Sequence, residues 1–294
     1  MTAFPLALRY ALLSAFGFAL MSACVKLASQ RGIPVLEIVA ARAVVSLLLS
    51  YWVVRHKRLP LFGQRKGLLF ARGAVGALTL VCVYYSVTTI PLAEATVLQY
   101  LHPMFTAVLA MLFLKERLQI STLLCICFSF LGLLAIAQPP IIFGSHTSPI
   151  AWLSLAVALL GSFGSAVAYV LIRKLNQTED PSVIIFYFPL ITLPFSLILL
   201  GNGAVMPAGS DWLVLLLVGV FTQIGQIGLT KAMQTETASK ATAYSYIQVL
   251  FSAVLGWAIF AETPGLWTWL GAGLIILGAL VNIFWTTKRP VSSP

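Results

Sequence analysis

The chain has 294 residues, of which 60% are hydrophobic and only 9% are charged, and its mean hydropathy is +0.98. A soluble domain is about half apolar and about a quarter charged, so these values exclude a soluble enzyme and indicate a protein embedded in lipid. The net charge of +10 would suggest a nucleic-acid partner in a soluble protein. In a membrane protein, basic residues usually encode topology instead, so we expect a lipid bilayer and no nucleic acid as partner.

Ten apolar stretches are long enough to cross the hydrocarbon core, which takes about 20 helical residues, and they predict an all-α membrane protein. In the first half the expected spans are Leu8–Ala28, Pro34–Val54, Gly67–Thr88, Ala93–Leu114 and Gln119–Ala137. In the second half they are Ile150–Ile172, Ser182–Leu200, Asp211–Ala232, Ala241–Ala261 and Leu266–Thr286. Proline and glycine occupy most of the separators, where water can again satisfy the backbone.

The distribution of lysine and arginine predicts the orientation of the chain. If the N-terminus lies in the cytoplasm, the inner segments hold 14 of the 18 basic residues and the outer segments hold only two, Lys26 and Arg31. The remaining two, Arg42 and Arg72, fall within spans. Basic residues concentrate on the cytoplasmic side of membrane proteins. Both termini are therefore expected in the cytoplasm, with the protein in the cell inner (plasma) membrane.

The chain also repeats itself at an offset of 146 residues, a register that aligns Tyr100 with Tyr246 and Glu116 with Glu262. Each repeat contains five spans, an odd number, so the two repeats cross the membrane in opposite directions. Inverted repeats are typical of secondary transporters, in which a central site opens alternately to either side. The expected fold is therefore ten transmembrane helices arranged as two inverted five-helix repeats.

Several stretches of each half carry a recognisable pattern. In the first half they are Leu69-Phe70-Ala71-Arg72-Gly73, Ala93-Glu94-Ala95-Thr96, His102-Pro103 and Leu114-Lys115-Glu116-Arg117, and in the second Gly225-Gln226, Ala241 to Leu255 and Ala261-Glu262. These stretches resemble two units of the EamA family in the drug/metabolite transporter superfamily, with a looser similarity to a solute-carrier 35G-like subgroup. The resemblance implies one unit over residues 1–140 and another over 141–294. It also implies a basket-like bundle whose central cavity moves small metabolites, often outward.

Three cations are candidates for binding substrate. Arg42 lies about 12 Å inside its span, at a depth that costs about 2.5–3.5 kcal/mol in lipid, so it should face protein or water. Two interpretations stay open, coordination of an anion in the cavity or a buried pairing with Glu94 or with helix-end carbonyls. Arg72 lies about one turn inside the inner end of its span, where snorkelling to the surface favours a structural role. Lys231 is expected near the inner end of the eighth span.

The uncharged candidates are polar and aromatic. Gln223 and Gln226 share one helix face near the bilayer centre and form either a polar cavity wall or hydrogen bonds between helices. His102 either carries a proton in a coupled cycle or is a satisfied polar residue beside a proline kink. The last group has two alternative roles, an amphipathic lining of the cavity or ordinary packing between helices. It consists of Tyr84, Tyr100, Tyr246 and Gln248.

The excess of cations over acids within the spans favours an organic anion or an amphiphilic amino-acid-like solute as substrate. The chain has no nucleotide-binding Gly-x-x-x-x-Gly-Lys motif and no carboxylate pair near the bilayer centre, so we expect no enzyme, no cofactor and no metal site. The expected function is secondary transport of this small metabolite, by export or exchange, coupled to a proton or a counter-substrate. Multidrug efflux or flippase activity is the alternative, and the protein is expected to work as a monomer or homodimer.

Overall fold

The computed structural model describes residues 6–89, 96, 98–137, 152–261 and 265–285, and the regular structure within them is entirely helical. The first half contains α1 (Leu6–Gln30), α2 (Val35–His56), α3 (Lys66–Thr89), α5 (His102–Phe113) and α6 (Ile120–Ala137). The second half contains α8 (Trp152–Leu175), α9 (Pro181–Leu200), α10 (Asp211–Thr235), α11 (Ala238–Ala243), the short 3₁₀ turn η1 (Tyr244–Tyr246), α12 (Ile247–Phe260) and α13 (Leu266–Phe284).

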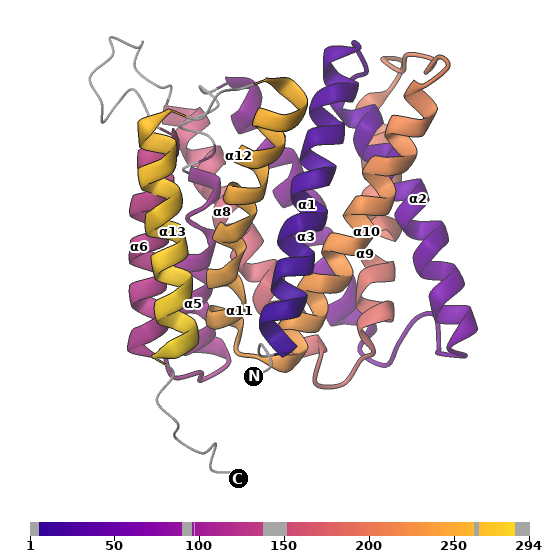
Figure 1. Cartoon of the computed structure of the whole chain (residues 1–294). Coiled ribbons are helices and arrows are strands. Elements are labelled where there is room, and N and C mark those ends of the chain that lie inside the picture. The colour runs from indigo at the N-terminus through magenta and orange to yellow at the C-terminus, as the bar shows by residue number, and fades with distance from the viewer. Residues whose placement is uncertain (1–5, 90–95, 97, 138–151, 262–264, 286–294) are drawn as a thin grey trace.

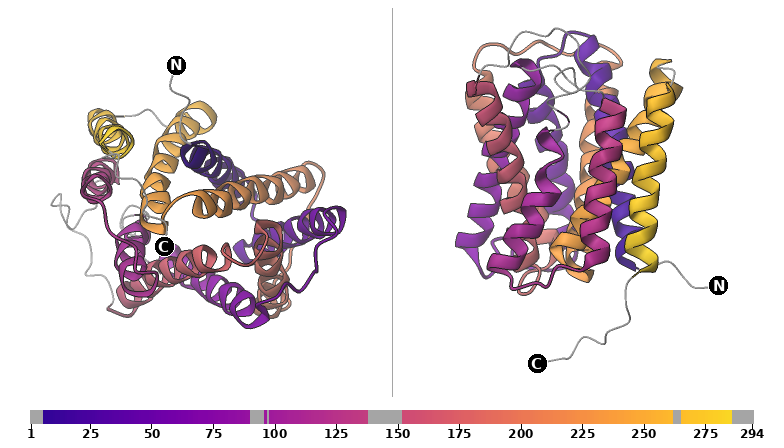
Figure 2. Two further views of the ribbon diagram at one scale, coloured as in Figure 1. Left: turned by 90° about the horizontal axis from the view of Figure 1, so that it is seen from below. Right: turned by 90° about the vertical axis from the view of Figure 1, so that its left-hand side faces the viewer.

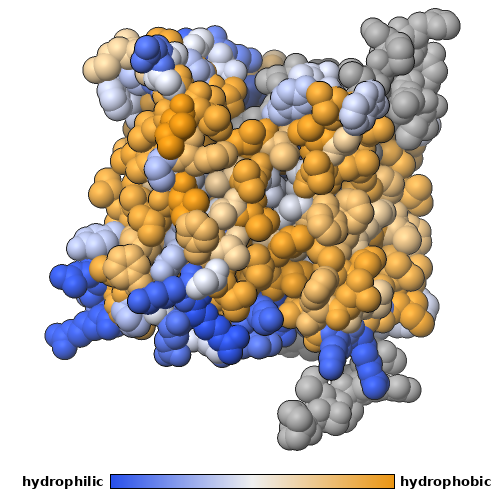
Figure 3. Space-filling model, turned by 180° about the vertical axis from the view of Figure 1, so that it is seen from behind, coloured by the Kyte–Doolittle hydropathy of each residue, from blue (hydrophilic) through white to orange (hydrophobic). Residues whose placement is uncertain are grey.

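The predicted membrane fold is confirmed. Within the described part of the chain, nine helical stretches are long and apolar enough to cross a membrane, and His102–Phe113 is a shorter apolar helix within the fourth expected span. Apolar side chains cover the flank of the molecule and hydrophilic side chains gather along its lower edge (Figure 3). The expected boundaries lie within three residues of the observed ones, apart from those that fall outside the described residues and the start of the fourth span.

The two halves have the same helices in opposite directions. Shifting α1, α2 and α6 by 146 residues gives 152–176, 181–202 and 266–283, which nearly coincide with α8, α9 and α13. Successive membrane-crossing helices alternate in direction, so α1 and α8 run opposite ways (Figure 1). The expected pair of inverted five-helix repeats is therefore confirmed. The face where α1 begins and α13 ends is called here the terminal face.

Helices of each repeat pack mainly on helices of the other repeat. α1 packs along α10, and the equivalent pair α8 and α3 packs in the same way. α2 packs on α9 and α6 packs on α13, so each of these helices meets its own counterpart. The view along the bundle shows α6 and α13 side by side at one edge (Figure 2). Each repeat thus provides much of the surface on which the other is packed.

Glycines allow these helices to approach closely. A Cβ atom on Gly17 of α1 would lie 2.7 Å from the backbone nitrogen of Gly225 on α10. Gly132 of α6 and Gly271 of α13 face each other, and a Cβ atom on either would collide with the carbonyl oxygen of the other. Because lipid provides no hydrophobic force between helices, such small-residue contacts are a main source of packing energy.

A proline interrupts the fourth span. Pro103 has no amide hydrogen to donate to the carbonyl of Gln99, and the hydroxyl of Ser162 donates to that carbonyl instead at 3.2 Å. The neighbouring carbonyl of Tyr100 accepts a hydrogen bond from the Tyr246 hydroxyl at 2.9 Å. Tyr246 belongs to η1, so both repeats deviate from regular α-helix at equivalent positions. Side chains of the opposite repeat satisfy the carbonyls that the interruption frees.

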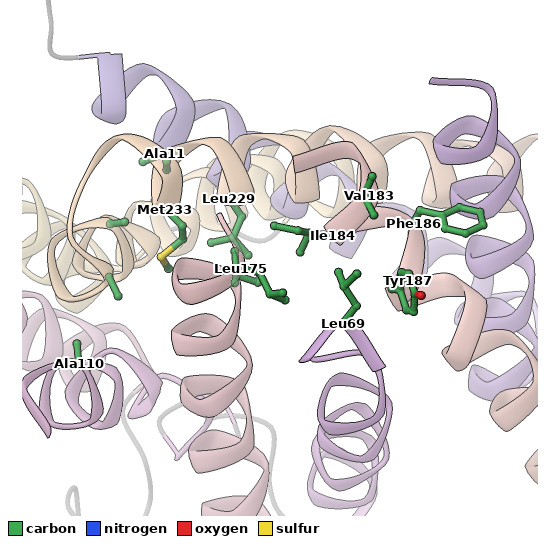
Figure 4. Close-up of a cluster of buried hydrophobic side chains, with 14 of the residues drawn as sticks. Ala11, Leu69, Ala110, Leu175, Val183, Ile184, Phe186, Tyr187, Leu229 and Met233 are labelled. Atoms are coloured by element: carbon green, nitrogen blue, oxygen red, sulfur yellow. The ribbon is translucent and has the colours of Figure 1, made fainter. Parts of the chain in front are cut away.

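A large apolar cluster closes the terminal face. We call it the terminal seal; it joins the ends of α1, α2, α3, α8, α9 and α10 (Figure 4) and includes Leu8, Val54, Leu69, Leu175, Ile184, Leu229 and Met233. All seven side chains are at most 6% exposed. The structure is therefore a conformation that is tightly packed on this face.

Charged contacts between the repeats surround the terminal seal. Lys57 forms an ion pair of 3.2 Å with Asp180. Burial tends to raise the pKa of Asp180, but hydrogen bonds from Ser182 and from Lys57 outweigh it and lower this pKa below its usual value. The carboxylate of Glu116 binds Arg173 at 3.3 Å and accepts a hydrogen bond from the Ala238 amide. Glu116 thus joins the two repeats, while its counterpart Glu262 lies outside the described residues.

We expect Gly271→Ala to lower the free energy of unfolding by about 1–3 kcal/mol, because overpacking forces α6 and α13 apart. Gly273→Ala is the matched control on the same helix, since a Cβ atom there meets nothing within 4 Å. This control should be neutral or slightly stabilising. Thermal unfolding in detergent measures both variants. Equal loss of stability in the two would contradict the close contact at Gly271.

Candidate substrate-binding site

A small cavity lies between α2, α9 and α10. Its walls carry both apolar and polar side chains, namely Arg42, Ala43, Ser46, Ile185, Phe188, Pro189, Thr192, Thr222, Gln223 and Gln226. The volume open to the centre of a water molecule is about 10 Å³, which is room for roughly one water. A metabolite does not fit into this space, so its binding requires the walls to move.

The cavity lies where the two repeats meet. The offset of 146 residues relates Arg42 to Phe188 and Ser46 to Thr192, and all four residues line the cavity. These positions are on α2 and α9, the counterparts that pack on each other. Equivalent positions of the repeats thus contribute different chemistry to one central site.

Arg42 is buried in this wall, with 7% of its surface exposed. Its Nη1 atom lies 3.7 Å from the Met21 sulfur, and its Cζ atom lies 5.9 Å from the ring centre of Phe188. Neither contact supplies a negative charge. Glu94, the alternative partner expected from the sequence, lies outside the described residues. The anion-binding interpretation therefore stays a proposal.

Arg72 of α3 approaches the same aromatic ring. Its Cζ atom is 4.6 Å from the Phe188 ring centre, and Nη2 donates a long hydrogen bond of 3.5 Å to Gln226. The side chain is only 3% exposed, so it does not snorkel to the surface as its position in the sequence suggests. Gly76, one turn further on, leaves the necessary space, because a Cβ atom there would lie 2.6 Å from Nη1.

The buried polar groups near Phe188 are incompletely satisfied within the described part of the chain. Nε and Nη1 of Arg72 have no hydrogen-bond partner there, nor have the hydroxyls of Ser46 and Thr192. Gln223 donates to Ser50 at 2.9 Å, but its Oε1 atom lacks a donor. An unpaired buried polar group costs about 1–3 kcal/mol, and a charged one costs more. Ser46, Thr192 and Gln223 line the cavity, and Arg72 lies behind two other lining residues, Phe188 and Gln226. Unpaired polar atoms at and beside one cavity are the arrangement expected of a site that binds a polar ligand.

His102 belongs to a group of aromatic side chains beside the interruption of the fourth span. It is buried, its Nδ1 atom has no partner among the described residues, and its ring lies 5.8 Å from Tyr100 and 5.1 Å from Tyr169. Tyr100 in turn stacks on Tyr246 at 5.7 Å.

The other predicted site residues lie elsewhere. Lys231 is half-buried near the terminal face, with its Nζ atom 5.3 Å from the ring centre of Tyr10 on α1, and it does not line the cavity. Gln248 lies half-buried on α12, and Tyr84 lies on α3 with its side chain outside the described part. The described residues contain no group of three or more His, Cys, Asp or Glu placed to hold a metal ion.

Sequence reasoning missed Phe188, Ser46, Thr192 and Tyr169. The repeat could have revealed two of them, because adding 146 to Arg42 and Ser46 gives Phe188 and Thr192. Serine, threonine and phenylalanine are common in membrane helices, however, and no local pattern marks these particular ones. Tyr169 has no such signal.

We expect Arg72→Met to leave the free energy of unfolding unchanged or to raise it, because the substitution removes a buried charge that lacks a counter-ion in the described chain. Arg173→Met is the contrasting variant, since Arg173 binds Glu116 and donates to the Met233 carbonyl at 2.8 Å. Arg173→Met should lower the free energy of unfolding by about 1–3 kcal/mol. Thermal unfolding in detergent without added anions compares the two. A marked loss in Arg72→Met would show that its role is structural.

Comparisons with known proteins agree with this architecture. Residues 5–138 and 151–284 each match the model of the EamA-like transporter family. The pseudopaline exporter CntI of Pseudomonas aeruginosa is 34% identical over 271 residues, which cover 92% of this chain and 93% of that protein. Solute carrier family 35 member G1 of Mus musculus is 32% identical over 284 residues, and the match covers 92% of this chain and 76% of that protein.

A solved crystal structure shares the fold, with a TM-score of 0.78 at 18% sequence identity, and the match covers 92% of this chain and 95% of that one. At this identity the likeness concerns the fold alone. The two family matches together span most of the sequence, and they coincide with the two sets of helices that run in opposite directions. The chain belongs to the EamA-like transporter family and is a multi-pass membrane transporter.

Proposed function

We propose that this transporter exports or exchanges a small organic anion, or an amphiphilic amino-acid-like solute with an anionic group, by binding it between Arg42 and Arg72. One observation carries the proposal: Arg72 is 97% buried, yet its Nε and Nη1 atoms have no partner in the described chain. A carboxylate accepts two parallel hydrogen bonds from a guanidinium and supplies the missing counter-charge.

The electrostatics of the cavity favour an anion over a lipophilic cation. Two guanidiniums approach Phe188 from different helices, and the described lining contains no carboxylate. In a medium of low dielectric constant, this excess of positive charge attracts anions and repels cations. Multidrug efflux of cations, the alternative function, would require the opposite charge in the cavity.

Alternating access follows from the inverted repeats. The observed conformation is packed at the terminal seal, and the cavity holds about one water. Exchange of the two repeat conformations would open the terminal face and close the opposite one. The basic loops support a cytoplasmic terminal face, and the name of the Pseudomonas aeruginosa relative, an exporter, supports outward transport. Coupling to a proton at His102, or to a counter-substrate, belongs to the same proposal, as does a monomeric or homodimeric state.

Transport of radiolabelled anions into proteoliposomes tests the proposed substrate class. We expect saturable uptake that needs no ATP, is lost in Arg42→Gln and is partly kept in Arg42→Lys, because lysine preserves the charge but not the forked geometry. Arg55→Gln, an exposed cation on the same helix, is the control and should transport normally. Uptake of lipophilic cations but not of anions would refute the proposal.

The tyrosine pair tests alternating access. In the observed state the Tyr246 hydroxyl donates to the Tyr100 carbonyl of the opposite repeat. Exchange of the repeats predicts the reciprocal bond, from the Tyr100 hydroxyl to the Tyr246 carbonyl, when the terminal face opens. Tyr246→Phe should then shift the equilibrium toward opening, and Tyr100→Phe toward closure. Each shift should be about fivefold, the equivalent of about 1 kcal/mol for one hydrogen bond.

The readout is maleimide labelling of Leu175→Cys, which is buried in the terminal seal, in a background whose native cysteines are replaced by alanine. Tyr246→Phe should speed the labelling and Tyr100→Phe should slow it. Tyr187→Phe is the control for a general loss of packing. It removes a different, partly buried hydroxyl, which donates to the Phe62 carbonyl at 3.0 Å. Faster labelling in both Tyr100→Phe and Tyr246→Phe would refute the exchange of hydrogen bonds.

A further inference from the structure

We propose that the substrate is a short organic dianion whose two anionic groups bind Arg42 and Arg72 at the same time, in place of the ring of Phe188. This inference rests on the proposed anion transport and narrows its substrate class. It depends on the geometry of three side chains from α2, α3 and α9, and on the number of buried charges that a substrate must neutralise.

Charge balance requires two anionic groups. Arg42 and Arg72 are 7% and 3% exposed, so neither guanidinium is well hydrated. The described chain forms no ion pair with either one; the face of Phe188 is their shared contact. A cation over an aromatic face gains about 0.5–2 kcal/mol, far less than a buried charge loses on leaving water. A monoanion would neutralise one guanidinium and leave the other without a counter-ion, whereas a dianion neutralises both.

The distances limit the length of such a substrate. The Cζ atoms of Arg42 and Arg72 lie 5.9 and 4.6 Å from the same ring centre, and because these distances add up to 10.5 Å, the Cζ atoms can be no farther apart. A forked guanidinium–carboxylate pair separates the two carbon atoms by about 4 Å. Two such pairs in line leave at most about 2.5 Å between the carboxyl carbons, and a bent arrangement leaves somewhat more. One or two carbons between the carboxylates satisfy this limit.

The remaining polar atoms indicate a substituent on the substrate. Gln223 donates from its Nε2 atom to Ser50, and its Oε1 atom is left as an acceptor without a donor among the described residues. The hydroxyls of Ser46 and Thr192 can donate or accept, and all three groups line the same cavity. A hydroxyl or amino group beside the carboxylates would supply the missing donor. The inferred class is therefore a three- or four-carbon dicarboxylate, preferably with a hydroxyl or amino substituent.

Phe188 defines the change that must accompany binding. Its ring is the shared neighbour of the two guanidiniums, so an anion that bridges them competes with the ring for both, and Pro189 follows it within α9. Proline removes a backbone hydrogen bond from the helix and allows it to bend. Displacement of the ring therefore couples binding of the dianion to the α2–α9 contact between repeats. A substrate that reaches only one arginine leaves the ring in place.

Affinity measurements test the inference. The purified full-length protein is titrated with succinate, malate, malonate and butyrate at pH 7.5 and constant ionic strength, with thermal stability as the readout. We expect the dicarboxylates to bind at least tenfold more tightly than butyrate, and malate more tightly than succinate. In Arg42→Gln and in Arg72→Gln the ratio of the affinity for a dicarboxylate to that for butyrate should fall to about one, while Arg55→Gln should keep the tenfold ratio.

The outcomes separate this inference from the proposed function. Equal affinity for butyrate and succinate would overturn the dianion inference and leave anion transport intact. Stabilisation by none of the four acids, with saturable uptake of another anion in proteoliposomes, would also overturn it. Absence of any anion binding or uptake would overturn both. Arg42→Lys serves as a second variant, since it keeps the charge and should retain part of the preference if Arg42→Gln fails to fold.

Discussion

Contact between helices of opposite repeats is the constraint on which the rest of the structure depends. α1 lies along α10, α3 lies along α8, and the pairs α2–α9 and α6–α13 join counterparts. Two glycines, Gly17 and Gly225, bring the first pair together almost backbone to backbone. Since a hydrocarbon solvent does not drive helices together, these close contacts must provide the packing energy. The two repeats are therefore not independent halves, because each is packed on the other.

The same arrangement explains why chemically different residues occupy equivalent positions of the two repeats at the site. An inverted repeat brings equivalent positions of α2 and α9 together, and two arginines there would repel each other in a low-dielectric interior. Phe188 stands at the position equivalent to Arg42 and offers the face of its ring. The second cation, Arg72, comes from α3, whose counterpart α10 contributes glutamines. The repeat thus provides a symmetrical frame, and substitution at a few positions provides an asymmetrical charge distribution.

The spans could be predicted from the sequence because hydropathy and helix-breaking residues act locally. In the fourth span, whose expected start lies outside the described residues, Pro103 marks the interruption locally, but no local pattern reveals the partners Ser162 and Tyr246. Arg42, Gln223 and Gln226, for which the sequence left a cavity role and a structural role open, line the same cavity. Arg72 and Lys231 could not be told apart, because the rotation of each helix about its axis decides which of them turns inward. That rotation depends on tertiary contacts such as the space beside Gly76.

The incompletely satisfied cavity also has a thermodynamic consequence. Without a bound anion, the guanidiniums of Arg42 and Arg72 share the Phe188 ring and have no counter-ion in the described chain. The hydroxyls of Ser46 and Thr192 also lack hydrogen-bond partners there. Such a site lowers the stability of the closed bundle by a few kcal/mol, which is a large share of a typical folding free energy. A ligand that satisfies these groups recovers that energy only in conformations where both arginines reach it. In the proposed alternating access, binding would shift the equilibrium between the two repeat arrangements by the difference of the ligand's affinities for the two states.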